Sequence, residues 1–179
     1  MSQTLHNSPA RLLRNRIAFT LVEILIVITI LAILATIAIP QFSSASHQAR
    51  ENTLKDELRY LRTQVAVYKA QHEDRPPGYP GGNTAAAPTV AAFTAQMTQH
   101  SDIVGNTAAA ASATYKYGPY LSKLPPNPIN GLDTFKIVGN GQPMPAPDGT
   151  TGFIYKPQTL EIIPNLPGND ASGTPYAQY

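Results

Sequence analysis

The chain has 179 residues, no cysteine and a formal net charge of +2. Its length allows one ordinary domain plus an anchoring segment, and the absence of cysteine excludes disulfides, thiolate metal sites and cysteine nucleophiles. Residues 1–18 contain three arginines and no acid, whereas the remainder contains ten basic and eleven acidic side chains. The main part is therefore near neutrality, so we expect no nucleic-acid partner, since such proteins need a clustered basic surface.

The first two segments predict a membrane helix behind a basic leader. The leader, 1–18, carries Arg11, Arg14 and Arg16. In the apolar segment, 19–40, the sixteen residues from Ile24 to Ile39 carry no charge, and eleven of them are Leu, Ile or Val. Residues 19–39 would make a helix about 31 Å long, which matches the hydrocarbon core of a bilayer. The arginines should keep the leader in the cytoplasm and place the remainder across the membrane.

The next segment, 41–75, predicts an amphipathic continuation of this helix. It has neither glycine nor proline, and apolar residues recur at alternating steps of four and three. Pro40, at the junction, removes a backbone hydrogen bond and should kink the helix. The apolar stripe consists of Leu54, Leu58, Leu61, Val65 and Tyr68.

The last segment, 76–179, is rich in Gly, Pro, Ala, Thr and Asn and should be largely loops. We predict a short helix over Val90–Gln99 and an antiparallel hairpin around the turn pair Pro157-Gln158. A sheet this small needs the striped helix face to cover it, so the predicted class is α+β: one long helix packed on a small antiparallel sheet. The predicted strands are 114–117, 134–138, 152–156 and 159–163.

Glu23 raises a question that the membrane prediction leaves open. A basic leader followed by an apolar run also occurs in secretory signals, and Ser44-Ala45-Ser46 is a small-x-small cleavage triplet. A simple signal anchor is the other alternative. An acidic residue near the end of the span can be tolerated in a helix this apolar. Tolerance does not explain why the residue is there.

The segment "AFTLVEILIVITILAILATIAIP" resembles the N-terminus of type IV pilin-like proteins, the family of pilins and type II secretion pseudopilins. The resemblance implies that a prepilin peptidase cuts between Ala18 and Phe19 and methylates the new amino group of Phe19. It also implies that Glu23 acts in assembly and that Pro40 is the helix proline of the family. Alanine at position 18 departs from the usual glycine.

Two stretches of the C-terminal half resemble the major pseudopilin of type II secretion: "YKYGPYLSKLPPNPINGLDTFKIV" and "TGFIYKPQTLEII". The pilin fold is the architecture implied. Pilus-forming pilins commonly close a C-terminal loop with a disulfide, so the absence of cysteine favours the pseudopilin branch. The resemblance also raises a calcium site, for which Asp148 and Asp170 are the acidic candidates. Calcium needs six to eight oxygen ligands, and the alternative is that both are turn residues.

No other chemistry stands out in the sequence. The four histidines are His6, His47, His72 and His100, and none has a second ligand at metal-binding spacing. The motifs H-E-x-x-H, G-x-S-x-G and the phosphate-binding P-loop are absent. Tyr115, Tyr117 and Tyr120 should pack the sheet against the helix, and the alternative is that they form a binding surface. We therefore expect neither an enzyme nor a cofactor other than the candidate calcium.

The sequence thus predicts a structural subunit of a type II secretion pseudopilus or a type IV pilus-like filament that serves protein secretion. The alternatives are a pilin for adhesion, motility or DNA uptake and, in another class, a membrane-anchored periplasmic binding domain. The expected location is the inner membrane, with a single pass and a periplasmic C-terminal domain. The expected partners are other copies of the chain, related subunits, the prepilin peptidase, the assembly platform and the lipid bilayer.

Overall fold

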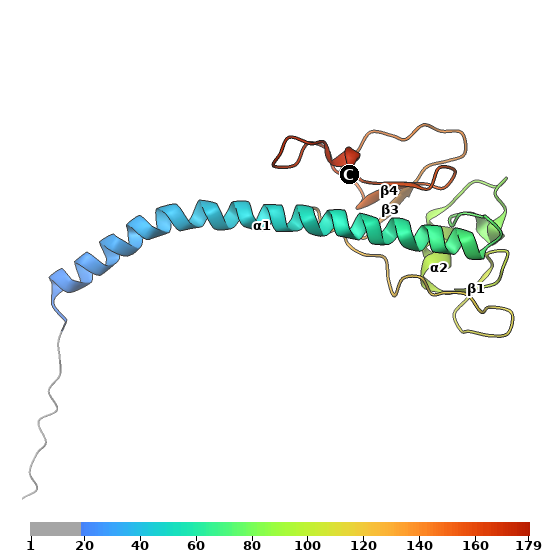
Figure 1. Cartoon of the computed structure of the whole chain (residues 1–179), viewed down its shortest axis with the longest axis horizontal. Helices are drawn as coiled ribbons and strands as arrows, with labels where there is room; N and C mark the ends of the chain where they lie inside the picture. The colour runs from blue at the N-terminus through green and yellow to red at the C-terminus, as the bar shows by residue number, and fades with distance from the viewer. Residues whose placement is uncertain (1–18) are drawn as a thin grey trace, which may run out of the picture. The chain divides into compact units, whose positions relative to one another are not determined.

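The computed structural model describes residues 19–179 (Figure 1). The predicted leader, with Ala18, lies outside the described residues. The chain divides into two units, Met1–Ser43 and Ser44–Tyr179. Helix α1, Leu21–Gln71, belongs to both and runs through Pro40 without an interruption. The kink predicted at Pro40 stays a prediction.

The predicted stripe of α1 forms one side of the core of the unit 44–179. All five stripe residues are buried, with at most 1% of each exposed. They share one hydrophobic cluster with α2, Val90–Thr98, and with a three-stranded sheet. Burial of a continuous apolar face is what holds a helix of this length on a small sheet. The prediction that α1 covers the sheet is confirmed.

The sheet contains β3, Phe135–Ile137, β4, Phe153–Lys156, and β5, Glu161–Pro164, in the order β3-β4-β5. Strands β4 and β5 form the predicted antiparallel hairpin, whereas β3 pairs with β4 in parallel. The α+β class is confirmed, but the sheet is mixed rather than antiparallel throughout. The long crossover 138–152 allows this, because parallel neighbours need a connection of about a dozen residues or more.

Both faces of the sheet are covered, which explains the apolar runs in its strands. Along β4, Phe153 and Tyr155 face the α1 cluster, while Ile154 packs in a second cluster with Val138 and Ile163. Met144 of the crossover and Ala177 of the short helix η2, Tyr176–Gln178, pack against that second cluster. A strand buried on both faces loses the alternation of polar and apolar residues.

The smaller elements begin or end at other residues than predicted. Helix α2 begins after Thr89, whose hydroxyl accepts a hydrogen bond from the amide of Ala92, and it ends at Thr98. The hairpin loop is longer than predicted, because Leu160 adopts a left-handed conformation and β5 begins only at Glu161. The predicted strand 114–117 is reduced to one bridge between Tyr117 and Ser101. The remaining elements are β1, His100–Ser101, β2, Thr107–Ala108, and η1, Pro80–Gly82.

Candidate functional site

Thr20 and Glu23 cap the N-terminus of α1. The carboxylate of Glu23 accepts hydrogen bonds from the amide and the hydroxyl of Thr20, both at 2.8 Å. In return the hydroxyl oxygen of Thr20 accepts the amide of Glu23 at 3.2 Å. This reciprocal arrangement is a capping box, in which two amides that lack a partner at the helix start are both satisfied.

The capping box gives Glu23 a local role that the sequence analysis missed. The signal was present as Thr-x-x-Glu directly before the apolar run. The box uses a single oxygen of the carboxylate, Oε2. Phe19, next to the box, is 75% exposed. The structure therefore supports a helix-capping role beside the predicted assembly role, which stays a prediction.

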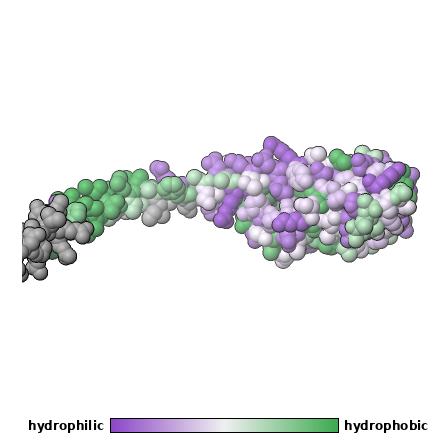
Figure 2. Space-filling model, turned by 90° about the horizontal axis from the view of Figure 1, so that it is seen from below, coloured by the Kyte–Doolittle hydropathy of each residue, from purple (hydrophilic) through white to green (hydrophobic). Residues whose placement is uncertain are grey.

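No residue of the apolar segment that follows is buried within the chain. Residues Leu21–Ala38 have a mean hydropathy of 2.8 and none of them is buried, and this is the single span among the described residues that could cross a membrane by length and composition. Figure 2 shows it as a continuous apolar surface. The hydroxyls of Thr29 and Thr36 donate to the carbonyls of Ile26 and Ile33, at 2.8 and 2.7 Å. No polar group of these two side chains is thus left for lipid to solvate.

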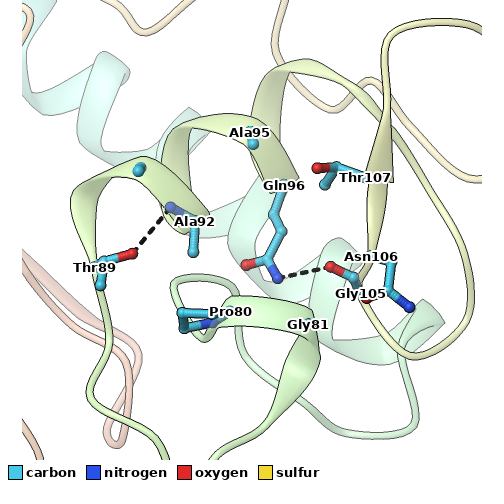
Figure 3. A pocket seen from close by; sticks show the side chains of 10 residues that line it. Pro80, Gly81, Thr89, Ala92, Ala95, Gln96, Gly105, Asn106 and Thr107 are labelled. Atoms are coloured by element: carbon cyan, nitrogen blue, oxygen red, sulfur yellow. Dashed lines mark hydrogen bonds between the residues drawn. The ribbon is translucent and has the colours of Figure 1, made fainter.

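In the unit 44–179, the hollow shown in Figure 3 is a groove of about 420 Å³ beside α2. Its lining contains no acidic, basic or histidine side chain. Gln96 lies across its floor and is 1% exposed; its amide nitrogen donates to the carbonyls of Tyr79 and Gly105, and its oxygen accepts the amide of Gly78. A side chain whose hydrogen-bonding capacity is already used holds loops together and offers little to a ligand.

Two side chains of α1, Glu51 and Arg62, form hydrogen bonds with the C-terminal region. The guanidinium of Arg62 donates to the carbonyl of Ile162 in β5, at 2.7 Å, and to the main-chain oxygen of Tyr179. The carboxylate of Glu51, 7% exposed, accepts from the amide of Ala171 and the hydroxyl of Tyr176. Each bond joins residues about a hundred positions apart, so these contacts fix the tertiary arrangement of this unit.

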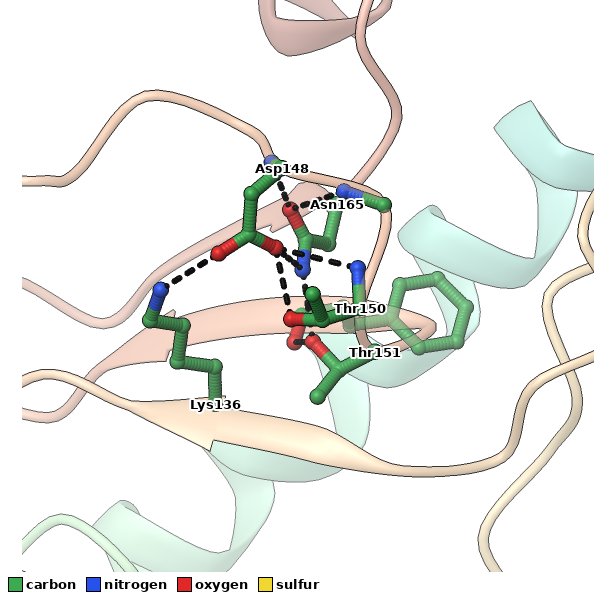
Figure 4. Close-up of polar contacts among 7 residues, drawn as sticks. Lys136, Asp148, Thr150, Thr151 and Asn165 are labelled. Carbon is green, nitrogen blue, oxygen red and sulfur yellow. Dashed lines mark hydrogen bonds and ion pairs between the residues drawn. The ribbon is translucent and has the colours of Figure 1, made fainter.

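Asp148, the first calcium candidate, is held by donors of the chain itself (Figure 4). One carboxylate oxygen accepts from the amide and hydroxyl of Thr150 and from the side-chain amide of Asn165, at 2.7–3.0 Å. The other accepts from the ammonium of Lys136 at 2.8 Å. The Lys136 ammonium and the other donors hold the pKa of Asp148 well below its usual range.

Asp170, the second candidate, organises a separate turn. One oxygen accepts from the amide and hydroxyl of Ser172 and the amide of Thr174, and the other from the hydroxyl of Tyr179. The Ser172 and Tyr179 hydroxyls lower the pKa of Asp170. Nowhere in residues 19–179 do three or more His, Asp or Glu side chains gather to hold a metal ion. Both acids behave as turn residues, the alternative weighed for them, and neither fits a calcium site.

His72 is buried at the end of α1. Its Nδ1 lies 2.7 Å from the carbonyl of Tyr68, so Nδ1 carries the hydrogen, and Nε2 accepts the hydroxyl of Ser101 at 2.9 Å. The ring stacks on Tyr68 and contacts the rings of Tyr117 and Tyr120. Burial lowers the pKa of His72. Tyr117 and Tyr120 thus pack on the end of α1, and Tyr120 also belongs to the core cluster that α1 shares with the sheet.

Comparison with known proteins bears on the first segment. Residues 13–39 match the family described as the prokaryotic N-terminal methylation motif. The chain is similar to type II secretion system core protein G of Pseudomonas aeruginosa, with 36% identity over 56 residues. That match covers 31% of this chain and 39% of the relative. No solved structure gives a significant match.

The motif lies where the capping box and the exposed apolar span lie. Together they indicate anchoring in the inner membrane by a prepilin-type segment. Members of this family are in general processed by prepilin peptidase and polymerise with one another. Proteins of this family are structural, and the prediction that the chain is not an enzyme is confirmed. The N-terminal segment of the chain is therefore that of a type IV pilin-like protein, with the N-terminal methylation motif at residues 13–39.

Proposed function

We propose that the chain is a structural subunit of a type II secretion pseudopilus, inserted in the inner membrane and polymerised through the apolar segment of α1. One observation carries the proposal: an apolar span with no residue buried in its own chain begins with a carboxylate, Glu23. A helix that stays in lipid could be capped by a neutral side chain, and a full charge is costly there. A helix that leaves lipid to pack with copies of itself can use the charge for alignment.

The alignment step follows from the proposed processing. Cleavage between Ala18 and Phe19 creates a positive amino group four residues before Glu23, one helical turn away. In a filament core an unpaired carboxylate would be very costly. The arrangement of lowest energy places the amine of an incoming Phe19 against the Glu23 of a subunit already in place. Selection of register is the best-attested use of buried ion pairs.

The secretion branch is favoured over a pilus for adhesion, motility or DNA uptake. The similarity to core protein G supports it, as does the lack of cysteines for a C-terminal loop disulfide. In this proposal residues 1–18 are the removed leader, 19–40 the assembly half, 41–75 the amphipathic half and 76–179 the periplasmic region. The partners are further copies, related subunits and an inner-membrane assembly platform.

Processing is tested by the intact mass of the membrane-extracted protein. We expect a chain that begins at Phe19 and carries one methyl group. The variant Ala18→Leu should leave the precursor uncut, because a large residue replaces the small one at the cleavage position. A chain that begins at Met1, or at His47 after signal-peptidase cleavage, would overturn the proposed processing.

The assembly role of Glu23 is tested by Glu23→Gln. Glutamine also closes a capping box, so this variant keeps the helix start and removes only the charge. We expect normal membrane level and processing but no filaments, as scored by shearing and electron microscopy. Glu23→Ala, which removes both the cap and the charge, should fail in the same way. Normal filaments from Glu23→Gln would mean that Glu23 serves the helix cap alone.

The choice between secretion and pilus is tested by deletion of the coding sequence. Loss of protein secretion, with adhesion, motility and DNA uptake retained, is the expected phenotype. Retained secretion together with lost motility would support the pilin alternative instead. Absence of the chain from purified filaments would favour the membrane-anchored binding domain.

A further inference from the structure

The loop at Asp148 is fastened to the end of β5 through one buried side chain. Asn165 is 0% exposed, and its side-chain oxygen accepts the amides of Asp148 and Gly149 at 2.7 and 3.3 Å. Its nitrogen donates to the carboxylate of Asp148 and to the hydroxyl of Thr151, at 2.7 and 2.8 Å. The side-chain amide of Asn165 is therefore fully paired, and the loop position depends on the carboxylate of Asp148.

That carboxylate has its two oxygens in different roles. Oxygen Oδ1 accepts three hydrogen bonds, from Thr150 and Asn165, whose hydrogens point at it. Oxygen Oδ2 accepts from the ammonium of Lys136. Lys136 lies in β3 between Phe135 and Ile137, which pack on the α1 side, so its side chain leaves the opposite face of the sheet toward the loop.

We propose that the ammonium of Lys136 is the built-in cation of this loop and that the loop forms without calcium. The ammonium balances the charge of Asp148 at 2.8 Å. A calcium ion would have to displace it from Oδ2 and could not use Oδ1, because donor hydrogens already surround that oxygen. Calcium needs six to eight oxygen ligands. This inference does not depend on the proposed filament function.

The competing interpretation is an ordinary surface ion pair. The side chains of Lys136 and Asp148 are 41% and 40% exposed, and pairs this exposed often contribute little to stability. The two interpretations differ in whether Lys136 is energetically coupled to the hydrogen bonds that hold the loop. As the loop cation, Lys136 acts through the network that holds Asn165, so its loss should loosen the loop and lower the unfolding temperature of the whole unit.

The experiment uses the full chain in detergent micelles and follows thermal unfolding by the near-ultraviolet dichroism of tyrosine. All nine tyrosines lie between residues 60 and 179 and the chain has no tryptophan, so the signal reports the unit 44–179 alone. The midpoint should be the same in excess EGTA and in millimolar calcium. Lys136→Met should lower it by about 1–4 °C, and the decrease should shrink in high salt.

The matched control is Lys123→Met, at an exposed lysine with no ion pair to any described residue. It should leave the midpoint unchanged. Asp148→Asn should lower the midpoint, and adding Lys136→Met to it should lower it little further, because the pair is already broken. A wild-type midpoint that rises with calcium, equal midpoints for Lys136→Met and Lys123→Met, or fully additive losses would each overturn the proposal.

Discussion

Thr20 and Glu23 satisfy each other at the start of α1, with the hydroxyl of Thr20 donating to the carboxylate at 2.8 Å and accepting the amide of Glu23 at 3.2 Å. This residue pair thus caps the helix at the start of the apolar span. In the proposed filament the carboxylate has a second task, which needs its charge rather than its geometry. The two tasks can be separated by changing one residue at a time.

Thr20→Val removes the hydroxyl and keeps the charge of Glu23. We expect filaments to form, while hydrogen exchange at the amide of Glu23 becomes several-fold faster because its capping partner is lost. Nuclear magnetic resonance of the labelled chain in micelles measures the exchange. Thr20→Ser keeps the hydroxyl and serves as the control. Loss of filaments in Thr20→Val alone would show that assembly needs the cap itself.

Leu58→Ala or Leu61→Ala should destabilise the unit 44–179 by about 2–5 kcal/mol, because each leaves a cavity beneath the sheet. Both residues are at most 1% exposed. The tyrosine signal in a denaturant titration measures the change. Val67→Ala, at a position of α1 that is 37% exposed, is the control and should change stability little. Equal effects at all three positions would contradict the observed core.

Arg62→Met should cost about 1–3 kcal/mol, because it leaves two main-chain oxygens, those of Ile162 and Tyr179, without this donor. Arg59 lies almost one turn earlier on α1, and its side chain is 78% exposed beside Asp56. Arg59→Met should therefore change the free energy of unfolding by less than about 0.5 kcal/mol. The contrast between the two variants is read in the same titration, and equal losses would argue against the Arg62 contacts.

Mild acid should destabilise the unit through His72. Burial lowers its pKa in the folded state, so below about pH 6.5 the unfolded chain takes up the proton first and stability falls as the pH falls. The lowered pKa values of Asp148 and Asp170 act below about pH 4 and do not interfere. Denaturant titrations between about pH 7.5 and 5.5 measure the slope.

His72→Gln should flatten that slope, because the buried group whose pKa is lowered is then absent. His47 is exposed, and His47→Gln should leave the slope unchanged. If the slope of His72→Gln equals that of the unaltered chain, another group is responsible for the acid sensitivity.

Local pattern was enough to predict the elements that depend on it. The stripe from Leu54 to Tyr68 follows from helical periodicity, and the β4–β5 hairpin follows from two apolar runs around Pro157. The parallel partner of β3 could not be predicted, since partner choice depends on how the crossover 138–152 packs. The contacts of Asp148 with Lys136 and with Asn165 likewise arise only in three dimensions.

The internal bonds of Thr29 and Thr36 have a mechanical consequence. Each hydroxyl donates its hydrogen bond to a carbonyl of its own helix. Beyond its first turn, the span therefore presents an almost uniform hydrocarbon surface to neighbouring helices. Sliding one such helix along another breaks no directional bond, although the interlocked side chains must separate and repack. In a bundle of these helices, the proposed ion pair at Glu23 would resist sliding at one end. The apolar contacts along the rest of the span would resist it less. It should lengthen under tension before it breaks.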